Sequence, residues 1–298
     1  MNDSTASVSA PSLPRFLTSV ILAIGIPAAV YWGIAQGDRS HFQTLAEVLA
    51  LVFGIQWLMF VHAWIARTER WFDLTGSLTF IAVALFGFSQ QEDPSIHHLV
   101  VAALITVWAL RLGSFLAIRI HRAGEDRRFR AIKQSFRRFL LVWCLQGTWV
   151  SLTTAVAIAV LFQPISGPND LWLITGTALW LLGFVIEVVA DRQKQTFRSA
   201  PENATRFIAS GLWAISRHPN YVGEILLWLG IAVIGWPHLS GWQHMALISP
   251  VFVYLLLTKM SGIPMLESAA AKHWSDDPSY QQYIARTPML WPRLWRRQ

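Results

Sequence analysis

The sequence has few charged residues and a single cysteine, and both shortages limit what the protein can be. Charged residues make up 14% of the 298 residues, whereas hydrophobic residues make up 54% and the mean hydropathy is +0.41. Soluble domains carry about 25% charged residues, so this composition is typical of a membrane protein. With Cys144 as the only cysteine, an intramolecular disulfide and a cluster of thiolate metal ligands are excluded.

Two nucleotide-binding patterns are also missing. The chain has neither a glycine-rich dinucleotide fingerprint nor a phosphate loop of the Lys-Ser/Thr type, so membrane helices and their ends must hold any nucleotide. His41, His62, His97 and His98 lack ligand-like spacing with acidic partners, and we predict no metal site. In a membrane protein, the formal charge of +7 indicates cytoplasmic loops, anionic lipid or a phosphate-bearing ligand rather than nucleic acid.

What the sequence does contain is a series of apolar runs, each close to the roughly 20 residues that cross a bilayer as a helix. They lie at about 16–34, 45–65, 72–89, 99–118, 140–162, 171–189, 221–236 and 245–263. Basic residues follow the second span (Arg67 and Arg70), fill the loops 119–138 and 192–217, and end the chain (Arg293, Arg296 and Arg297). All of these basic segments fall on one side of the membrane only if the number of spans is even. We therefore predict an all-α polytopic membrane bundle of about eight helices (seven to eight), with both termini in the cytoplasm.

The domain organisation follows from the same pattern. Residues 1–14 are polar and rich in Ser, Ala and Pro, without the basic segment that begins a signal peptide, and we expect a disordered tail there. Residues 15–298 are expected to form a single transmembrane domain, and they show no internal repeat.

One polar stretch, 211–225, interrupts this apolar chain. Gly211 permits a tight turn, and Pro219 fits the first turn of a helix, so the following residues are expected to begin one. Polar side chains beside the free N–H groups of a helix N-terminus form an anion site. The alternative is an ordinary interfacial loop that precedes a membrane span.

Ionisable residues within spans are costly and usually functional. Asp73 lies near the start of the third span, where the alternative is an interfacial carboxylate paired with Arg67 or Arg70. Arg111 lies in the middle of the fourth span and needs a partner or an anionic ligand.

A second group of charges lies at the cytoplasmic end of the sixth span. Glu187 and Asp191 are four residues apart on one helix face, and Lys194 and Arg198 continue along it. Carboxylates that accept bonds from ribose hydroxyls, beside arginines that bind phosphates, suit a dinucleotide. The basic loop 124–130 offers more of the same, although alone it is typical of a solvated cytoplasmic loop.

These residues resemble the signature of the steroid 5α-reductase superfamily, and the match is closest to its bacterial branch, catalogued as a domain of unknown function. The resemblance covers about residues 45–293. It rests on Gly211-Leu212-Trp213, the run Ser216-Arg217-His218-Pro219-Asn220-Tyr221 and Gly223-Glu224, supported by 108–112, Arg119, 124–126 with Arg128, Glu187, Asp191, Arg198, Ser261-Gly262, Leu266-Glu267 and 283–292.

The resemblance implies a membrane enzyme that uses NADPH to reduce a C=C bond conjugated to a carbonyl. Hydride passes to the β-carbon while an acid polarises the carbonyl oxygen. The cofactor-binding residues that it implies are Arg111, Arg119, Arg128, Glu187, Asp191, Arg198, Ser216, Arg217, His218, Asn220, Tyr221 and Glu224. Glu187 stands where steroid reductases carry Asn.

The residues that would hold the substrate differ more from those of the family. Asp73 falls where the family has a Glu that holds the carbonyl, and Trp108 falls where it has a Tyr. A buried, protonated Asp can donate to an oxyanion, whereas an indole N–H donates a hydrogen bond but no proton. We take Asp73 and Trp108 as the catalytic candidates. The expected substrate is a lipid or steroid-like enone whose identity stays open, as does the preference for NADPH over NADH.

The expected location is the bacterial inner membrane, with the cofactor site facing the cytoplasm. Membrane lipids are the expected partners, with neither nucleic acid nor an obligate protein partner.

Two alternatives stay open. Membrane methyltransferases of the isoprenylcysteine and phospholipid type share an Arg-His-Pro-x-Tyr-x-Gly stretch that contributes to an S-adenosylmethionine site. Asn220 and Glu224 favour the reductase, and Glu267 lacks the adjacent Glu that is typical of the methyltransferases. The second alternative is a non-catalytic lipid-binding protein that has kept the scaffold and lost the acid.

Overall fold

The computed structural model describes residues 11–126, 128–165 and 170–292. These residues are mainly helical and include no β-strand. The helices of the first half are α1 (Leu13–Ile34), α2 (Arg39–Ala66), α3 (Phe72–Ser89), α4 (Ile96–Ala123), α5 (Phe129–Ile132), α6 (Phe136–Thr153) and α7 (Ala155–Leu161). Those of the second half are α8 (Asp170–Ser199), α9 (Pro219–Gly235), α10 (Ile248–Leu255), α11 (Ile263–Trp274) and α12 (Pro278–Arg286), with short 3₁₀ segments and one π-helical segment, Leu256–Met260.

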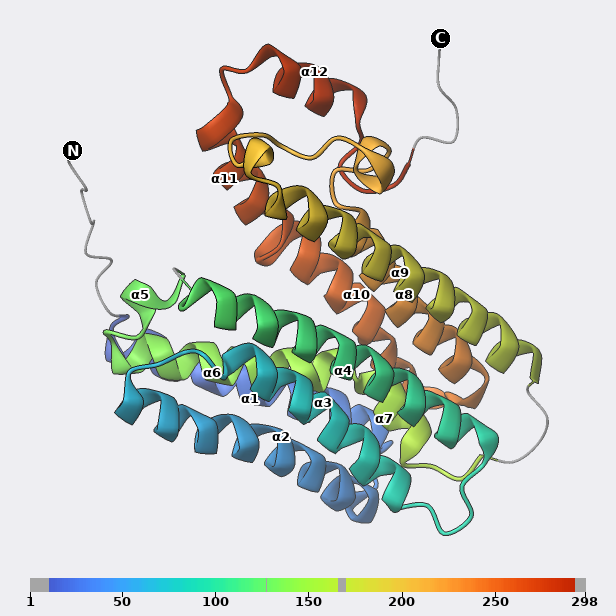
Figure 1. Ribbon diagram of the computed structural model, residues 1–298. Coiled ribbons are helices and arrows are strands. Elements are labelled where there is room, and N and C mark those ends of the chain that lie inside the picture. Colours follow the sequence, from blue (N-terminus) through green and yellow to red (C-terminus); the bar gives the residue numbers. More distant parts are fainter. Residues whose placement is uncertain (1–10, 127, 166–169, 293–298) are drawn as a thin grey trace. The chain divides into compact units, whose positions relative to one another are not determined.

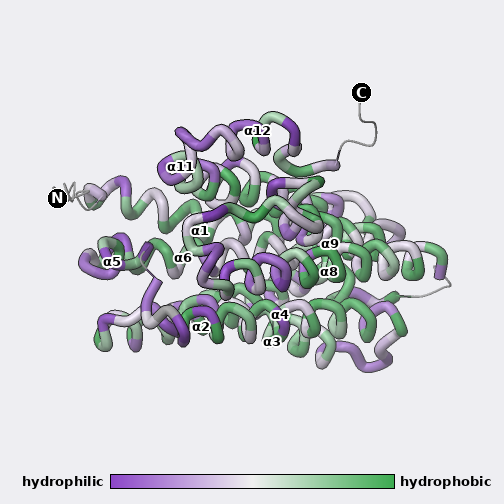
Figure 2. The backbone as a smooth tube through the Cα atoms, turned by 45° about the horizontal axis from the view of Figure 1, so that its top comes forward, coloured by the Kyte–Doolittle hydropathy of each residue, from purple (hydrophilic) through white to green (hydrophobic). Residues whose placement is uncertain are grey.

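Within the described residues, 7 helical segments are long and apolar enough to cross a membrane. An eighth candidate is broken, because α6 and α7 meet at Thr154 with a bend of 54°. The long helices are mostly hydrophobic, and hydrophilic residues gather near α5 and along α11 and α12 (Figure 2). The prediction of an all-α membrane bundle with seven to eight spans is confirmed. The cytoplasmic placement of the termini stays a prediction, and residues 1–10 of the expected tail lie outside the described residues.

The contacts within the chain define two compact units. The N-terminal unit comprises residues 1–167 and 238–248, and the C-terminal unit comprises 168–237 and 249–298. In the N-terminal unit, α3 packs along α4, and α6 contacts both α1 and α2 (Figure 1). Aromatic side chains fill one part of its core, where Phe139 and Trp143 of α6 are fully buried beside Phe60 and Phe129.

In the C-terminal unit, α8 and α9 lie along one another, and glycines hold them unusually close (Figure 1). A Cβ atom on Gly183 would lie 2.6 Å from the carbonyl oxygen of Gly223, and one on Gly230 would lie 2.6 Å from that of Gly176. Only residues without a side chain allow two helix backbones to approach so closely. Gly223, in the polar stretch 211–225 that we call the signature stretch, is therefore a packing residue, and it fixes the beginning of α9 against α8.

Candidate functional site

The signature stretch begins with a turn that α8 holds in place. Gly211 has a φ of +61°, a conformation that favours glycine, and a Cβ there would lie 2.6 Å from the Gln193 side chain. The Gln193 carbonyl accepts a hydrogen bond from the backbone N–H of Leu212 at 3.0 Å. The indole N–H of Trp213 donates to the carbonyl of Ala190 at 3.1 Å, and Lys194 Nζ lies 4.6 Å from the Trp213 ring centroid. The turn is thus anchored to the C-terminal half of α8.

The prediction that Pro219 opens a helix is confirmed, because α9 begins at that residue with His218 as its N-cap. Proline at the first helical position costs no hydrogen bond. The backbone N–H of His218 donates to Ser216 Oγ at 3.3 Å, and the Tyr221 ring stacks on the His218 ring at 5.7 Å. Ser216 and His218 are both buried, at 1% and 5% exposure.

One carboxylate on α11 contacts two residues of this stretch. Glu267 Oε2 accepts from Arg217 Nη1 at 2.5 Å, and Glu267 Oε1 lies 2.7 Å from His218 Nε2. Burial lowers the pKa of the His218 imidazole below its ordinary value, although Glu267 acts in the opposite direction. The ring is therefore neutral at neutral pH, and Arg217 carries the positive charge of the cluster.

The C-terminal residues cover the same stretch from another direction. The Tyr283 hydroxyl donates to the Trp213 carbonyl at 2.8 Å, and Thr287 Oγ1 donates to the Ala214 carbonyl at 3.4 Å. The backbone N–H of Arg217 donates to the carbonyl of Pro288 at 2.9 Å. Burial raises the pKa of Tyr283, so its hydroxyl stays protonated as a donor. The stretch is thus fixed by contacts from α8, from α11, and from α12 with the segment that follows it.

A cavity of about 730 Å³ opens beside this cluster. Its cationic lining residues are Lys194, Arg198, Arg217 and Lys272, whereas Glu267 is the one carboxylate among the described lining residues. Arg198 and Lys272 make no ion pair within the described part of the chain. The cavity therefore has an excess of positive charge, which favours an anionic ligand.

Aromatic rings form one wall of the cavity. Phe207 contacts Trp274, Tyr280 and Tyr283, with ring centroids 5.1 to 5.9 Å apart. The indole N–H of Trp274 donates to the Thr205 carbonyl at 2.8 Å, which fixes this wall to the loop after α8. Flat apolar surfaces beside cations suit a nucleotide base and its phosphates.

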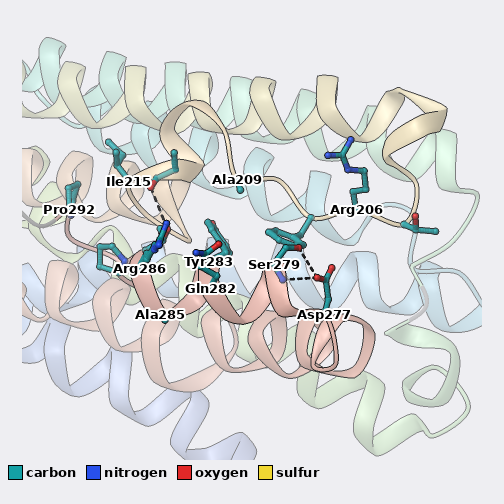
Figure 3. A pocket seen from close by; sticks show the side chains of 15 residues that line it. Arg206, Ala209, Ile215, Asp277, Ser279, Gln282, Tyr283, Ala285, Arg286 and Pro292 are labelled. Atoms are coloured by element: carbon teal, nitrogen blue, oxygen red, sulfur yellow. Dashed lines mark hydrogen bonds between the residues drawn. The ribbon is translucent and has the colours of Figure 1, made fainter. Parts of the chain in front are cut away.

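A second, larger pocket of about 1280 Å³ shares Thr205, Phe207 and Tyr283 with the first. Figure 3 shows side chains of α12, including Gln282 and Arg286, that point toward the loop carrying Ala209 and Ile215. The cationic side chains of this larger pocket are Arg206, from the loop after α8, and Arg286, from the end of α12. The two pockets of the C-terminal unit are therefore adjacent, and the aromatic residues Phe207 and Tyr283 line both of them.

Only some of the predicted cofactor residues of this unit line the cavity. Glu187 of α8 is 3% exposed, and a Cβ on Gly223 would lie 2.6 Å from its backbone nitrogen. The cavity is lined by Arg198, Arg217 and His218 of the predicted set. The described residues that line it do not include the other members, Glu187, Asp191, Ser216, Asn220, Tyr221 and Glu224.

The remaining candidates belong to the N-terminal unit. Asp73 Oδ2 lies 3.4 Å from Arg119 Nη2, and its side chain is 18% exposed. The expected alternative partners of Asp73 are wrong, because Arg67 donates to the Lys133 carbonyl and Arg70 to the Gly124 carbonyl. The helix α4 extends to Ala123, beyond the predicted end of its span at 118, and Arg119 therefore lies beside Asp73 at the beginning of α3. The sequence near Asp73 does not indicate this contact.

Arg128 is held by its own loop. It donates to both carboxylate oxygens of Asp126. Burial raises the pKa of Asp126, but these hydrogen bonds lower it by more, so the pKa lies below its ordinary value. Arg111 lies over the Phe115 ring at 5.4 Å. Trp108 is fully buried, with its ring 5.0 Å from that of Phe80, so it is part of the helix core.

Sequence reasoning missed several residues of the cavity. Glu267 was part of the family resemblance but had no role assigned, although it contacts both Arg217 and His218. Tyr280 and Tyr283 are three residues apart and share one face of α12, and that spacing is the signal that would have identified them.

These features define a polytopic helical membrane protein with a cationic, aromatic cavity beside the N-terminus of a helix. The comparison with protein families agrees with this class. The family described as a protein of unknown function, DUF1295, matches residues 59–287. The chain belongs to this family, which is part of the steroid 5-alpha-reductase-like superfamily. The resemblance noted from the signature residues is confirmed.

The individual relatives include reductases and methyltransferases. The bovine 3-oxo-5-alpha-steroid 4-dehydrogenase 1 is 33% identical over 74 residues, which is 25% of this chain and 28% of that protein. Methanethiol S-methyltransferase 2 of Bradyrhizobium diazoefficiens is 25% identical over 56% of this chain and 67% of that protein. The mouse Delta(14)-sterol reductase TM7SF2 is 27% identical over 38% of this chain and 28% of that protein.

The chain thus spans about a quarter of the length of the steroid dehydrogenases that it matches. No solved structure matches it significantly.

Proposed function

We propose that this protein is a membrane reductase that uses NADPH to reduce a C=C bond conjugated to a carbonyl in a lipid or steroid-like substrate. The observation that carries the proposal is the charge of the cavity beside α9. Four permanent cations, Lys194, Arg198, Arg217 and Lys272, line it together with a single carboxylate, Glu267.

This excess of positive charge distinguishes between NADPH and S-adenosylmethionine, the cofactors of the reductase and of the methyltransferase alternative. NADPH carries a pyrophosphate and a 2′-phosphate, so a cluster of Lys and Arg compensates its negative charge. S-adenosylmethionine carries a net positive charge, which the same side chains repel. The residues present fit NADPH, and they fit a sulfonium cation poorly.

The roles of the lining residues follow from their chemistry. Arg198 and Lys272, which have no ion partner within the described residues, would bind the phosphates. The rings of Trp274 and Tyr280 offer a surface for the adenine base. Lys194 lies over the Trp213 ring, so it also limits how far a ligand enters toward α8.

When bound, NADPH supplies a hydride, and the protein must then deliver a proton to balance the reduction. Asp73 and Trp108 remain the proposed catalytic residues. Asp73 can polarise a carbonyl by donation only when it is protonated, and a protonated carboxyl group can donate from one oxygen while the other accepts from Arg119, which lies 3.4 Å from Oδ2. Arg119 is then itself a donor near the same position.

The names of relatives support this reaction class. Two of them describe oxidoreductases that act on carbon–carbon bonds of steroids or sterols. We place the cofactor cavity and both termini on the cytoplasmic side of a bacterial inner membrane, because the basic loops fall there. The proposed cofactor residues in the N-terminal unit are Arg111, Arg119 and Arg128, and those in the C-terminal unit are Glu187, Asp191, Arg198, Ser216, Arg217, His218, Asn220, Tyr221 and Glu224.

A methyltransferase is the second candidate function, and one specific finding favours it. The methanethiol S-methyltransferase match covers more of this chain than the steroid dehydrogenase matches do. In this alternative, Arg217 to Glu224 would bind S-adenosylmethionine, with Glu267 providing negative charge near the sulfonium. The cations that line the cavity argue against it.

An activity assay tests the proposal. The purified protein in lipid vesicles is mixed with NADPH and a panel of lipid enones, and substrate-dependent oxidation of NADPH is followed. A reductase consumes NADPH in proportion to the saturated product that forms. Methyl transfer from S-adenosylmethionine to a thiol in the same preparation, without any oxidation of NADPH, would contradict the proposal.

A further inference from the structure

Residues 263–288, which include α11 and α12, are attached to the rest of the C-terminal unit by few apolar contacts. Each of the two helices contains a single buried residue, Ile263 in α11 and Tyr280 in α12. In the described part of the chain, α12 packs along no other helix, and α11 packs along only the π-helical segment that precedes it. A region with so little buried apolar surface separates from the core at a lower free-energy cost than a core helix does.

Hydrogen bonds connect this segment to the loop 200–218, which joins α8 to α9 at the same end of the unit (Figure 1). The pairs are Glu267 with Arg217 and His218, Trp274 with Thr205, Tyr283 with Trp213, Thr287 with Ala214, and Pro288 with Arg217. Water can replace such bonds when they break. The segment can therefore move away from the loop without exposing a large apolar surface.

The regular α-helix is interrupted immediately before the segment. The helix α10 continues into the π-helical turn Leu256–Met260, and α11 begins after Gly262. A Cβ atom on Gly262 would lie 2.4 Å from the carbonyl oxygen of Leu257, so a residue with a side chain does not fit there. Single π-helical turns are frequent at functional sites, and they replace the regular helical bonds locally. This interruption is the place at which α11 can rotate relative to α10.

Both pockets of the C-terminal unit lie between the segment and the loop. In the cavity of about 730 Å³, Lys272 belongs to α11, whereas Arg198 belongs to α8 and Arg217 to the loop. The larger pocket lies between α12 and the part of the loop that carries Ala209 and Ile215 (Figure 3). Cations on both walls of a cavity repel one another, and an anion between them attracts both walls.

We propose that residues 263–288 form a lid over the nucleotide cavity, which opens about the π-helical turn and Gly262 and which a bound dinucleotide holds closed. A phosphate between Lys272 of the lid and Arg198 or Arg217 of the other wall stabilises the closed lid relative to the open one. The inference rests on the proposed function for the identity of the ligand. It adds the step that encloses the cofactor and excludes water from it.

The experiment measures hydrogen exchange of the backbone amides of the full-length protein in detergent by mass spectrometry, with and without NADP⁺. Without nucleotide, we expect the amides of α11 and α12 to exchange about tenfold faster than those in the middle of α8 and α9. Calorimetry gives the dissociation constant of NADP⁺. At about ten times that concentration, the nucleotide should slow exchange in both lid helices by about tenfold, because it binds the closed lid, and leave the middle of α9 unchanged.

A substitution that keeps the charge of the cavity tests whether the lid opens as one unit. Tyr283→Phe removes the hydroxyl that donates to the Trp213 carbonyl at 2.8 Å. Without nucleotide, this variant should exchange about two to ten times faster throughout α11 and α12. Thr287→Val, which removes the bond to the Ala214 carbonyl, should act in the same direction.

The matched control for exchange without nucleotide is Tyr280→Phe. Tyr280 lies on the same helix, and its hydroxyl makes no hydrogen bond within the described residues. The same chemical change at this position should leave the exchange of α11 at the wild-type rate. If Tyr280→Phe accelerated α11 as much as Tyr283→Phe does, the hydrogen bonds to the loop would not hold the lid, and the inference would be wrong.

The outcomes separate the lid from the proposed function. If Tyr283→Phe accelerates only the amides next to residue 283, α12 frays alone and the lid is wrong, whatever the cofactor is. If calorimetry detects no binding of NADP⁺, the proposed function and the ligand assigned to the lid are both wrong. If NADP⁺ binds and slows exchange near Arg198 and Arg217 but not in α11 and α12, only the lid is wrong. Acceleration of both helices by Tyr283→Phe, together with their protection by NADP⁺, supports the inference.

Discussion

Gly183 on α8 and Gly223 on α9 face each other at backbone contact. A Cβ on Gly183 would lie 2.6 Å from the Gly223 carbonyl oxygen, and one on Gly223 would lie 2.5 Å from that of Gly183. Gly223 is four residues after Pro219, so this contact sets the position of the helix N-terminus beside the cavity. The signature glycine is thereby explained by packing rather than by ligand contact.

We expect Gly223→Ala to destabilise the protein, because the added methyl group collides with backbone atoms that cannot rotate away. A cost of about 1–3 kcal/mol is typical of such overpacking. Gly183→Ala should act similarly. The measurement is the thermal unfolding midpoint of the purified protein in detergent.

The matched control is Gly25→Ala in α1, where nothing lies within 4 Å of the added atom. That change should be neutral or stabilising, because Ala favours a helix over Gly by up to about 1 kcal/mol. Equal effects of the two substitutions would show that the close contact between α8 and α9 has no special role.

The charge of the cavity leads to the next prediction. Arg198→Gln and Lys272→Gln should each weaken NADPH binding by roughly tenfold, because each removes a charge-assisted bond to a phosphate. Arg192→Gln, an exposed cation on the same helix that lines neither pocket, is the control. Calorimetry in low and high salt gives the measurement. If Arg192→Gln weakened binding as strongly, general attraction rather than this cavity would explain the affinity.

Much of the fold could be predicted from the sequence, because apolar length and basic loops constrain a membrane bundle strongly. The beginning of α9 at Pro219 and the turn at Gly211 were predicted correctly, since Pro and Gly restrict the backbone locally. The bend at Thr154 between α6 and α7 was not, because the apolar run continues through it, and Gly147, the one Gly or Pro of that run, lies seven residues before the bend.

The candidate site was predicted only in part. Residues near each other in sequence, such as Arg217 and His218, were recognised together. Glu267 was given no role because its contacts with them span about fifty positions, and no local pattern encodes that distance. Asp73 was matched with nearby arginines for the same reason, whereas its partner is Arg119 on the next helix.

The stability of the protein should depend on the protonation of His218. Its pKa in the folded state lies below the ordinary value of 6.5, so the folded protein resists protonation that the unfolded chain accepts. This contribution to stability is present above pH 6.5 and is lost as the pH falls toward the folded-state pKa. Thermal midpoints of the wild type should therefore decrease more steeply below pH 6.5 than those of His218→Asn. Parallel curves would exclude a depressed pKa.

The proposed proton donor gives a separable prediction. Asp73→Asn should leave NADPH binding unchanged, since Asp73 lines neither pocket of the C-terminal unit, but should abolish turnover of an identified enone because an amide delivers no proton. Arg119→Gln removes the partner of Asp73 while keeping the carboxyl group, so this variant should still turn over the enone, although it should bind NADPH more weakly because Arg119 is a proposed cofactor residue. Unimpaired turnover by Asp73→Asn would show that another residue supplies the proton.

The measurement that tests the central claim most directly compares NADPH with S-adenosylmethionine as ligands of the purified protein. A ligand that binds only the folded state raises the thermal midpoint according to its concentration relative to its dissociation constant. We predict a stabilising shift with NADPH, none with S-adenosylmethionine, and loss of the NADPH shift in Arg198→Gln. A shift with S-adenosylmethionine alone would contradict the reductase and assign Arg217 to Glu224 to a methyl-donor site.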